Sequence, residues 1–313
     1  MSVQDKDLAE KWHKQVEGIW HGCPGIFDKD GNYQGYVQAD RSIYIDDEGT
    51  HLIRVDTKVN CQGPLRTRLE TPQHLLTVSH VEEKRVYNGP DFYGCGYPYG
   101  TLILGNDYCI PWRTDNRVHV QLLPGEQLQA YSNTAIEGNQ IVCVITGLYK
   151  LSRDYDTNEA TRQMIEEHRN HEIAIAKNPH ILERRATGTF HGKLETFTPD
   201  QKMVGETEVT WKHNPITQYR QEMNLTMTGA YERECRIERN RHENRYWFED
   251  GFWGNGIAYG RAHFWRGNFK GETTRLIARD FKLEDGSLAV VWEAYRADTL
   301  EYVMHGVLKW TAD

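Results

Sequence analysis

The chain has 313 residues, of which 38% are hydrophobic and 26% are charged, a composition typical of a soluble globular protein of about two domains. Its formal net charge of −8 at pH 7 excludes the basic face that nucleic acid requires and disfavours an anionic membrane surface as a partner. No stretch approaches the ~20 apolar residues that cross a bilayer, and the acidic N-terminus is unlike a secretory signal. We therefore expect a cytoplasmic protein.

The six cysteines occur singly, without a C-x-x-C pair, and five of them lie in the first half of the chain. This uneven distribution argues against a repeated disulfide framework, so we expect reduced thiols, as in a cytoplasmic protein. The cysteines are Cys23, Cys61, Cys95, Cys109, Cys143 and Cys235.

In chain order, residues 8–17 have the spacing of a short amphipathic helix, and Gly18-Ile19-Trp20-His21-Gly22 then opens a strand. The second half opens in the same way, with Gly188-Thr189-Phe190-His191-Gly192. A second segment also recurs, because the sequence FYGCGYPYG of residues 92–100 returns as FWGNGIAYG at residues 252–260. Two matching segments in the same order in both halves predict an internal duplication.

Within each copy the hydrophobic period is two, as in Ile53–Cys61 and Tyr219–Met227, which predicts half-buried strands. About eight short strands per copy, separated by turns and connected in sequence, predict a mainly β protein of two tandem antiparallel up-and-down (lipocalin-like) β-barrels. Further strands are expected at 74–86, 101–110, 117–123, 127–133, 140–151, 231–241, 244–250, 258–267, 272–282, 287–296 and 300–311.

A helix is expected to join the two barrels. Asp156 with Glu159 resembles a capping box, and a helix of ~20 residues would end before Asn178-Pro179. The predicted domains are a first barrel with its N-terminal helix at 1–152, a linking helix at 153–185, and a second barrel at 186–313. His168 and His171 on this helix fit a solvated face better than a metal site.

The Gly18-x-Trp20 opening of an antiparallel barrel resembles the first strand of the lipocalin and wider calycin group. The resemblance implies that the Trp closes the barrel base beneath a cation of the last strand, which here would be Lys150, or Lys309 over Phe190 in the second copy. The Gly-x-Trp-x-Gly pattern is also similar to nitrobindin-like haem barrels, in which His305 would be a haem ligand. A two-barrel arrangement as in carotenoid-hydratase-like proteins is the implied architecture.

The glycine-rich repeat has two interpretations. Its glycines fit either a tight barrel corner in which the aromatic side chains pack, or a rim that faces a ligand. Residues shared by both copies are expected to serve the fold, so the unshared Tyr93 and Tyr97 are predicted catalytic residues. In the second copy, Trp253 and Tyr259 are predicted to bind substrate on the rim interpretation.

The strand 231–241 places Arg233 and Arg239 on its less polar face, which should turn inward. An arginine inside a barrel requires a partner, so it either forms an internal salt bridge or anchors a carboxylate or enolate. We predict Arg233, Arg239 and Asp280 as catalytic residues of the second barrel. Tyr246 and His305 are predicted to bind substrate, and the polar candidates of the first barrel are His74, His80 and Arg85.

His21 and His191 are expected to point outward if Trp20 and Phe190 point inward, because side chains alternate along a strand.

Two functions remain open. The first is a cofactor-independent acid–base enzyme of the lyase, isomerase or hydratase type, acting on a small hydrophobic or aromatic substrate in a barrel cavity. The second is a non-catalytic carrier of a hydrophobic ligand such as haem or a pigment. Nucleotide and metalloprotease motifs are absent, so no metal site is expected, and a homodimer is compatible with either function. In both cases one barrel could have lost its cavity and only support the other.

Overall fold

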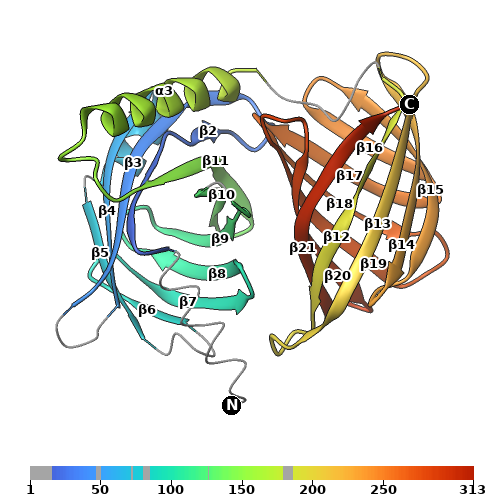
Figure 1. Cartoon of the computed structure of the whole chain (residues 1–313), viewed down its shortest axis with the longest axis horizontal. Coiled ribbons are helices and arrows are strands. Elements are labelled where there is room, and N and C mark those ends of the chain that lie inside the picture. The colour runs from blue at the N-terminus through green and yellow to red at the C-terminus, as the bar shows by residue number, and fades with distance from the viewer. Residues whose placement is uncertain (1–15, 47–50, 72, 80–84, 126, 179–185) are drawn as a thin grey trace. The chain divides into compact units, whose positions relative to one another are not determined.

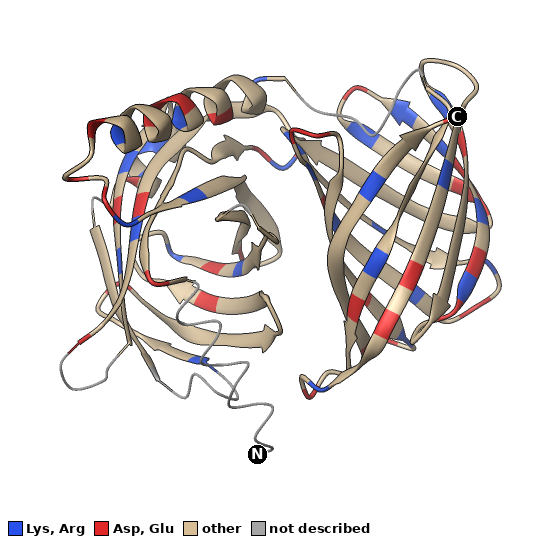
Figure 2. Cartoon of the chain, viewed as in Figure 1, with Lys and Arg blue, Asp and Glu red and all other residues tan. Residues whose placement is uncertain are grey.

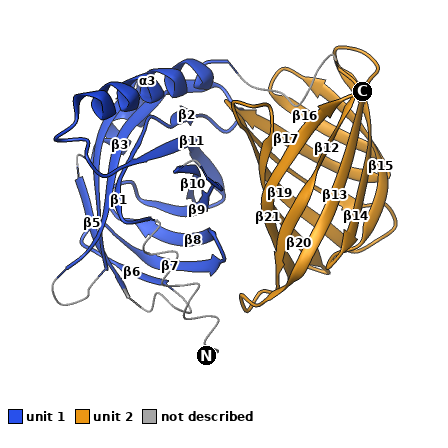
Figure 3. Ribbon diagram, viewed as in Figure 1, with its two compact units in different colours: residues 1–178 blue, residues 179–313 orange. Residues whose placement is uncertain are grey.

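The computed structural model describes residues 16–46, 51–71, 73–79, 85–125, 127–178 and 186–313. The chain divides into two compact units, residues 1–178 and 179–313 (Figure 3). Each unit is a closed antiparallel β-barrel (Figure 1). The prediction of a mainly β protein with two tandem barrels is therefore confirmed.

The first barrel closes because β1 pairs with both β11 and β3. Strand β2 follows β1 after Pro24 and pairs with the same two neighbours, β3 and β11. The two short strands therefore share one position in the barrel, which has ten strand positions in all. Its strands are β1 (Gly18–Gly22), β2 (Gly25–Phe27), β3 (Tyr33–Ile45), β4 (His51–Cys61), β5 (Gln73–Ser79), β6 (Arg85–Asn88), β7 (Phe92–Tyr99), β8 (Leu102–Cys109), β9 (Thr114–Leu122), β10 (Leu128–Glu137) and β11 (Gln140–Ser152).

The second barrel also has ten strands, each paired with its neighbours in sequence. The predicted count of about eight was too low, since the expected strand 74–86 is two strands and the glycine-rich repeat adds one per barrel. The strands are β12 (Gly188–Phe197), β13 (Met203–Pro215), β14 (Arg220–Gly229), β15 (Arg233–His242), β16 (Arg245–Asp250), β17 (Phe252–Tyr259), β18 (Ala262–Phe269), β19 (Thr274–Lys282), β20 (Leu288–Arg296) and β21 (Thr299–Ala312).

The glycine-rich repeat forms the regular strands β7 and β17, so its interpretation as a barrel corner was wrong. Glycine is needed there because neighbouring backbones approach closely. A Cβ on Gly94 would lie 2.3 Å from the carbonyl oxygen of Asn106, and one on Gly254 would lie 2.2 Å from that of Arg266. The repeat therefore preserves the same close strand contact in both barrels.

Trp20 and Phe190 are fully buried in the cores of their barrels, as expected. The lysines implied by the resemblance are not placed over them. Lys150 pairs in register with His21, and Lys309 pairs with His191, so both lie on the outward phase of their strands. The ring of Trp310 contacts Phe190 instead, with 4.7 Å between centroids.

Two described helices accompany the first barrel, the short α2 (Pro64–Leu69) and the long α3 (Glu159–Ala176). Helix α3 is the predicted helix between the barrels, but its N-cap is Asn158, whose side chain accepts hydrogen bonds from the amides of Ala160 and Thr161. The capping box at Asp156 was wrong. The helix contacts β11, β1, β2 and β3, and it carries charges of both signs (Figure 2). The helix expected at residues 8–17 falls largely outside the described residues.

Candidate functional site

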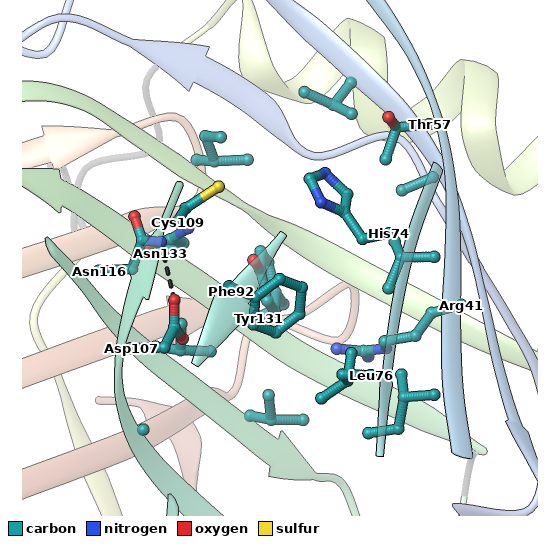
Figure 4. A pocket seen from close by; sticks show the side chains of 18 of the residues that line it. Arg41, Thr57, His74, Leu76, Phe92, Asp107, Cys109, Asn116, Tyr131 and Asn133 are labelled. Atoms are coloured by element: carbon teal, nitrogen blue, oxygen red, sulfur yellow. Dashed lines mark hydrogen bonds between the residues drawn. The ribbon is translucent and has the colours of Figure 1, made fainter. Parts of the chain in front are cut away.

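The first barrel encloses a cavity of about 190 Å³, to which all the strands from β3 to β11 contribute side chains. The surface that the cavity walls expose is mostly apolar, and the polar groups of several lining residues are set into it, as is typical of a small-molecule site (Figure 4). The apolar lining comprises Val37, Ala39, Ile53, Val55, Leu76, Phe92, Ile103, Val118, Val120 and Ile145. The polar lining comprises Arg41, Thr57, His74, Tyr87, Asp107, Cys109, Trp112, Asn116, Tyr131, Asn133 and Tyr149.

Strand pairing explains why this barrel is hollow and the second is filled. One row of facing residues crosses the first barrel as Gly105, Val118, Asn133 and Ile145. The corresponding row of the second barrel is Trp265, Ala278, Trp292 and Met304. Two tryptophans therefore stand where the first barrel has a glycine and an asparagine.

A third tryptophan of the second barrel, Trp211, stands where the first barrel has Arg41. Trp20 pairs with Arg41 on β3, and the equivalent Phe190 pairs with Trp211 on β13. The rings of Trp211, Trp265 and Trp292 contact one another with centroids 5.9 to 6.1 Å apart. Large side chains thus occupy the interior of the second barrel.

Asp107 places a carboxyl group in the apolar cavity. Its Oδ1 accepts a 2.8 Å hydrogen bond from Nδ2 of Asn116 (Figure 4). Oδ1 of Asn116 in turn accepts one of 3.1 Å from Thr114. Burial raises the pKa of Asp107 to about 6, although the hydrogen bond from Asn116 opposes this shift. The group can therefore gain or lose a proton near neutral pH.

Arg41 presents a guanidinium group to the same cavity. It lies over the ring of Tyr149 at 4.6 Å and that of Tyr131 at 5.5 Å, and it donates to Oε1 of Gln129. Among the described residues it has no carboxylate partner. From β3 to β8 there are five steps around the barrel in either direction, so Arg41 and Asp107 stand on opposite walls.

The charges of Arg41 and Asp107 both affect the pKa values of two buried tyrosines, Tyr131 and Tyr87. Burial raises the pKa of Tyr131 to about 12, with the positive charge of Arg41 opposing the shift and the negative charge of Asp107 adding to it. Burial also raises the pKa of Tyr87, where the Asp107 and Arg41 charges act in the same opposed way. Both phenols are therefore neutral hydroxyl groups at pH 7.

His74 completes the polar lining on β5. Its ring contacts Phe92 and Trp112 edge-on, at 5.7 and 5.8 Å between centroids. Burial lowers the pKa of His74, and the Asp91 carboxylate, 3.9 Å from Nδ1, only partly offsets this. His74 was a predicted polar candidate, and Arg85 is also buried, whereas His80 lies outside the described residues.

Three predicted residues meet inside the second barrel. Arg239 lies over the ring of Tyr246 at 5.3 Å and donates to Oε1 of Gln221. Asp280 accepts hydrogen bonds from the indole nitrogens of Trp265 at 2.5 Å and Trp292 at 2.8 Å. Burial raises the pKa of Asp280 to about 7, with the two indole hydrogen bonds and the Arg239 charge opposing the shift.

The other predicted residues lie elsewhere. Arg233 is near the barrel end, where it contacts Tyr231, Phe269 and Glu272. Trp253 is 55% exposed, and Tyr259 packs on Phe264, both on the strand face opposite the core residues Phe252 and Ala258. His305 alternates with the core residue Met304, stacks on Phe197 and lies 3.5 Å from a Glu195 oxygen.

Tyr93 and Tyr97 are also separated from the cavity. Phe92 lines the cavity, so Tyr93 and Tyr97, at odd positions of the same strand, lie on its outer face. Tyr93 is 54% exposed. Tyr93 and Tyr97 thus lie on the outside of the first barrel, whereas Arg239 and Asp280 are buried within the second unit.

Arg41 and Asp107 were not among the predicted site residues, although the sequence contains a signal for them. Each interrupts the apolar phase of its strand, Arg41 after Val37 and Ala39, and Asp107 after Ile103 and Gly105. The same reasoning identified Arg233 and Arg239, and applying it to every strand would have found the charges of the first cavity.

No protein-family model matches the chain, and no curated protein matches it. Among solved structures, it is similar to a protein of unknown function from the DUF3598 family of Nostoc punctiforme PCC 73102, with a TM-score of 0.60 and 10% identity over 100% of both chains. This similarity shows a shared fold.

Two further solved structures have TM-scores too low to support an argument. One is a Bacteroides fragilis NCTC 9343 protein assigned to the outer membrane, with a TM-score of 0.26, 6% identity and coverage of 96% of this chain and 99% of that chain. The other is isotype 1 transferrin binding protein B of serogroup B Neisseria meningitidis, with a TM-score of 0.24, 6% identity and coverage of 92% and 69%. None of the described helices combines the length and apolar character needed to cross a membrane.

Proposed function

We propose that the first barrel is a cofactor-independent acid–base enzyme of the lyase, isomerase or hydratase type, acting on a small, mainly apolar or aromatic molecule in the cytoplasm. The observation that supports this is Asp107, a carboxyl group with a pKa of about 6 in an apolar cavity that also contains a guanidinium group. A general base acts best when its pKa lies near the working pH.

The chemistry requires only groups that line the cavity. In an isomerisation, the Asp107 carboxylate would remove a proton from the carbon next to a carbonyl group and return it to another carbon. The negative charge that develops on the carbonyl oxygen would be stabilised by the Arg41 guanidinium and by the neutral phenols of Tyr87 and Tyr131. The proton and the charge are both balanced without an added reagent.

The size of the cavity supports a substrate of about one ring. An apolar cavity of ~150 Å³ accommodates benzene, and this one measures about 190 Å³. Haem, with four pyrrole rings, is far larger. The mostly apolar lining also supports the second candidate, a carrier of a small hydrophobic ligand, which is the role that the resemblance to the calycin group would favour.

Solvent exchange tests the enzyme directly. The full chain would be incubated in D₂O with acetophenone and 3-cyclohexenone, and deuterium incorporation at carbon would be followed by ¹H NMR. We expect exchange that rises with pH through about 6 as Asp107 ionises, and a loss of ~100-fold or more in Asp107→Asn.

The matched control is Asp115→Asn, which alters an exposed acid on the neighbouring strand β9 and should leave exchange unchanged. Binding of these ketones without exchange, at a level that Asp107→Asn does not alter, would refute the enzyme and favour the carrier.

A further inference from the structure

We infer that the cavity selects a one-ring molecule with an anionic oxygen at one end and a neutral hydroxyl group at the other, that is, a hydroxy-substituted ring carboxylic acid. The inference rests on the proposed function, because it names the substrate class of the same site. The observation behind it is a set of polar atoms in the cavity that make no hydrogen bond to any described residue.

Besides Nε of Arg41, three buried polar atoms in the lining lack a hydrogen bond to any described residue. They are Oδ1 of Asn133, Nδ1 of His74 and Nε1 of Trp112. Asn133 is 4% exposed and His74 is 5% exposed. More than ~90% of buried polar groups in proteins are hydrogen-bonded, so three such atoms around one cavity indicate that its occupant supplies the missing partners.

The wall formed by β8, β9 and β10 requires a hydrogen-bond donor. Oδ1 of Asn133 can only accept, and the side chain of Asn116 is already used by Asp107 and Thr114. Asn116 bonds to Oδ1 of Asp107, which leaves Oδ2 without a hydrogen bond from a described residue and so open as a second acceptor. A neutral hydroxyl group fits better than an ammonium group, since this environment disfavours charge on Asp107 itself.

The opposite wall requires an anion. The Arg41 guanidinium faces the cavity with Nε unpaired, and no described carboxylate neutralises it. A partly buried cation without a counter-ion is costly, whereas a carboxylate can accept two parallel hydrogen bonds from a guanidinium. Between the walls, Phe92 and aliphatic side chains provide an apolar space for the ring (Figure 4).

Binding of three probes to two variants tests the assignment of both ends. The probes are 4-hydroxybenzoate, benzoate and phenol, and their dissociation constants would be measured by titration calorimetry on the full chain. We expect 4-hydroxybenzoate to bind ~10-fold or more tightly than either probe that lacks one polar group, since a hydrogen bond to a charged group contributes ~1.5–3 kcal/mol.

The variants should act selectively. Arg41→Met should weaken 4-hydroxybenzoate and benzoate by ~10-fold or more while leaving phenol unchanged, and Asn133→Leu should weaken 4-hydroxybenzoate and phenol while leaving benzoate unchanged. Arg117→Met, an exposed position on β9, is the matched control. Equal affinity for all three probes, or no binding of any of them, would overturn the inference.

The comparison of probes on the wild-type chain decides the question even if a variant does not fold. Binding with the expected selectivity but without deuterium exchange would refute the proposed catalysis and leave the substrate class intact. Exchange of ketones without any preference for 4-hydroxybenzoate would do the reverse.

Discussion

At the scale of single residues, two buried carboxyl groups differ in what surrounds them. Asp107 faces a cavity and is oriented by one amide, whereas Asp280 is 1% exposed and enclosed by the indoles of Trp265 and Trp292. In both cases burial raises the pKa of the carboxyl group. Of the two, Asp107 is the one that lines the cavity of the first barrel.

Asp280 should make stability depend on pH. Its pKa is about 7 when folded and about 4 when unfolded, so between these values the folded chain retains a proton that the unfolded chain releases. Stability therefore falls as pH rises from 4 to 7. Asp280→Asn mimics the protonated acid and should remove up to about 4 kcal/mol of this dependence.

Urea unfolding at pH 4.5 and pH 8, followed by tryptophan fluorescence, measures this effect, because six of the nine tryptophans lie in the second barrel. We expect Asp280→Asn to gain stability relative to the wild type at pH 8 but not at pH 4.5. A stability difference that is the same at both values would show that Asp280 is ionised across the whole range.

The residue scale also shows the limits of the sequence. The inward face of β15 was predicted from its pattern, and Ile237 and Arg239 are indeed buried. What the pattern could not reveal is whether an inward charge meets a protein partner or an empty space, because this depends on strands that are distant in sequence. Each arginine donates to a glutamine, Arg239 to Gln221 and Arg41 to Gln129, but Arg41 also lines a cavity.

At the scale of elements, helix α3 is attached to the outer wall of the first barrel through Arg169, which lies beside His21, a side chain only 1% exposed. Nδ1 of His21 donates to Oδ1 of Asp40 at 2.6 Å, and Oγ of Ser152 lies 2.9 Å from Nε2. Arg169 of α3 pairs with Asp40 and with Glu166. A serine, a histidine and an aspartate joined in this way resemble a hydrolytic triad. Ser152 is only 5% exposed, however, so these residues form a covered attachment for the helix and not an open hydrolytic site.

The same position in the second barrel confirms what the helix contributes. His191 is exposed, and its neighbours in register are Thr210 and Lys309, neither of which is an acid. Both histidines lie on the outward phase of their strands, as predicted. Whether such a position is buried or exposed depends on the helix, which the strand pattern does not describe.

Removal of the arginine should loosen the helix. Arg169→Met leaves the Asp40 carboxylate, 32% exposed, without its cation. The expected loss is about 2 kcal/mol, between the values for exposed and fully buried pairs. Burial alone would raise the pKa of Asp40, but His21 and Arg169 hold it below its ordinary value, so this contribution is present above pH ~4 and is lost as pH falls through that lowered pKa.

The control is Arg162→Met, which breaks an exposed pair with Glu159 on the same helix and should change stability by less than ~0.5 kcal/mol. Urea unfolding of both variants at pH 7 gives the comparison. Equal losses in the two variants would contradict the role of Arg169 as the anchor of α3.

At the scale of the whole molecule, the duplication preserved the strand arrangement and changed the contents of the barrels. The recurring segments predicted two barrels, and both are present. The occupancy of each barrel depends on rows of residues that face one another across strands, such as Gly105 and Asn133 against Trp265 and Trp292. Such rows become visible only when the register is known, so the sequence alone could not indicate which barrel is hollow.

This difference predicts that the first barrel can be filled as the second one is. Gly105 lines the cavity, and a Cβ added to it would lie 3.4 Å from Val118 and 3.8 Å from a Cys95 oxygen, which is ordinary contact. The Gly105→Phe variant should therefore fold, with its new side chain inside the cavity. Because this side chain takes the space of the ligand, the affinity for 4-hydroxybenzoate should fall by ~10-fold or more. Asp280→Asn should leave that affinity unchanged, since all residues that line the cavity belong to the first unit. The opposite result, in which Asp280→Asn abolishes binding and Gly105→Phe does not, would place the site among Arg239, Tyr246 and Asp280 of the second barrel.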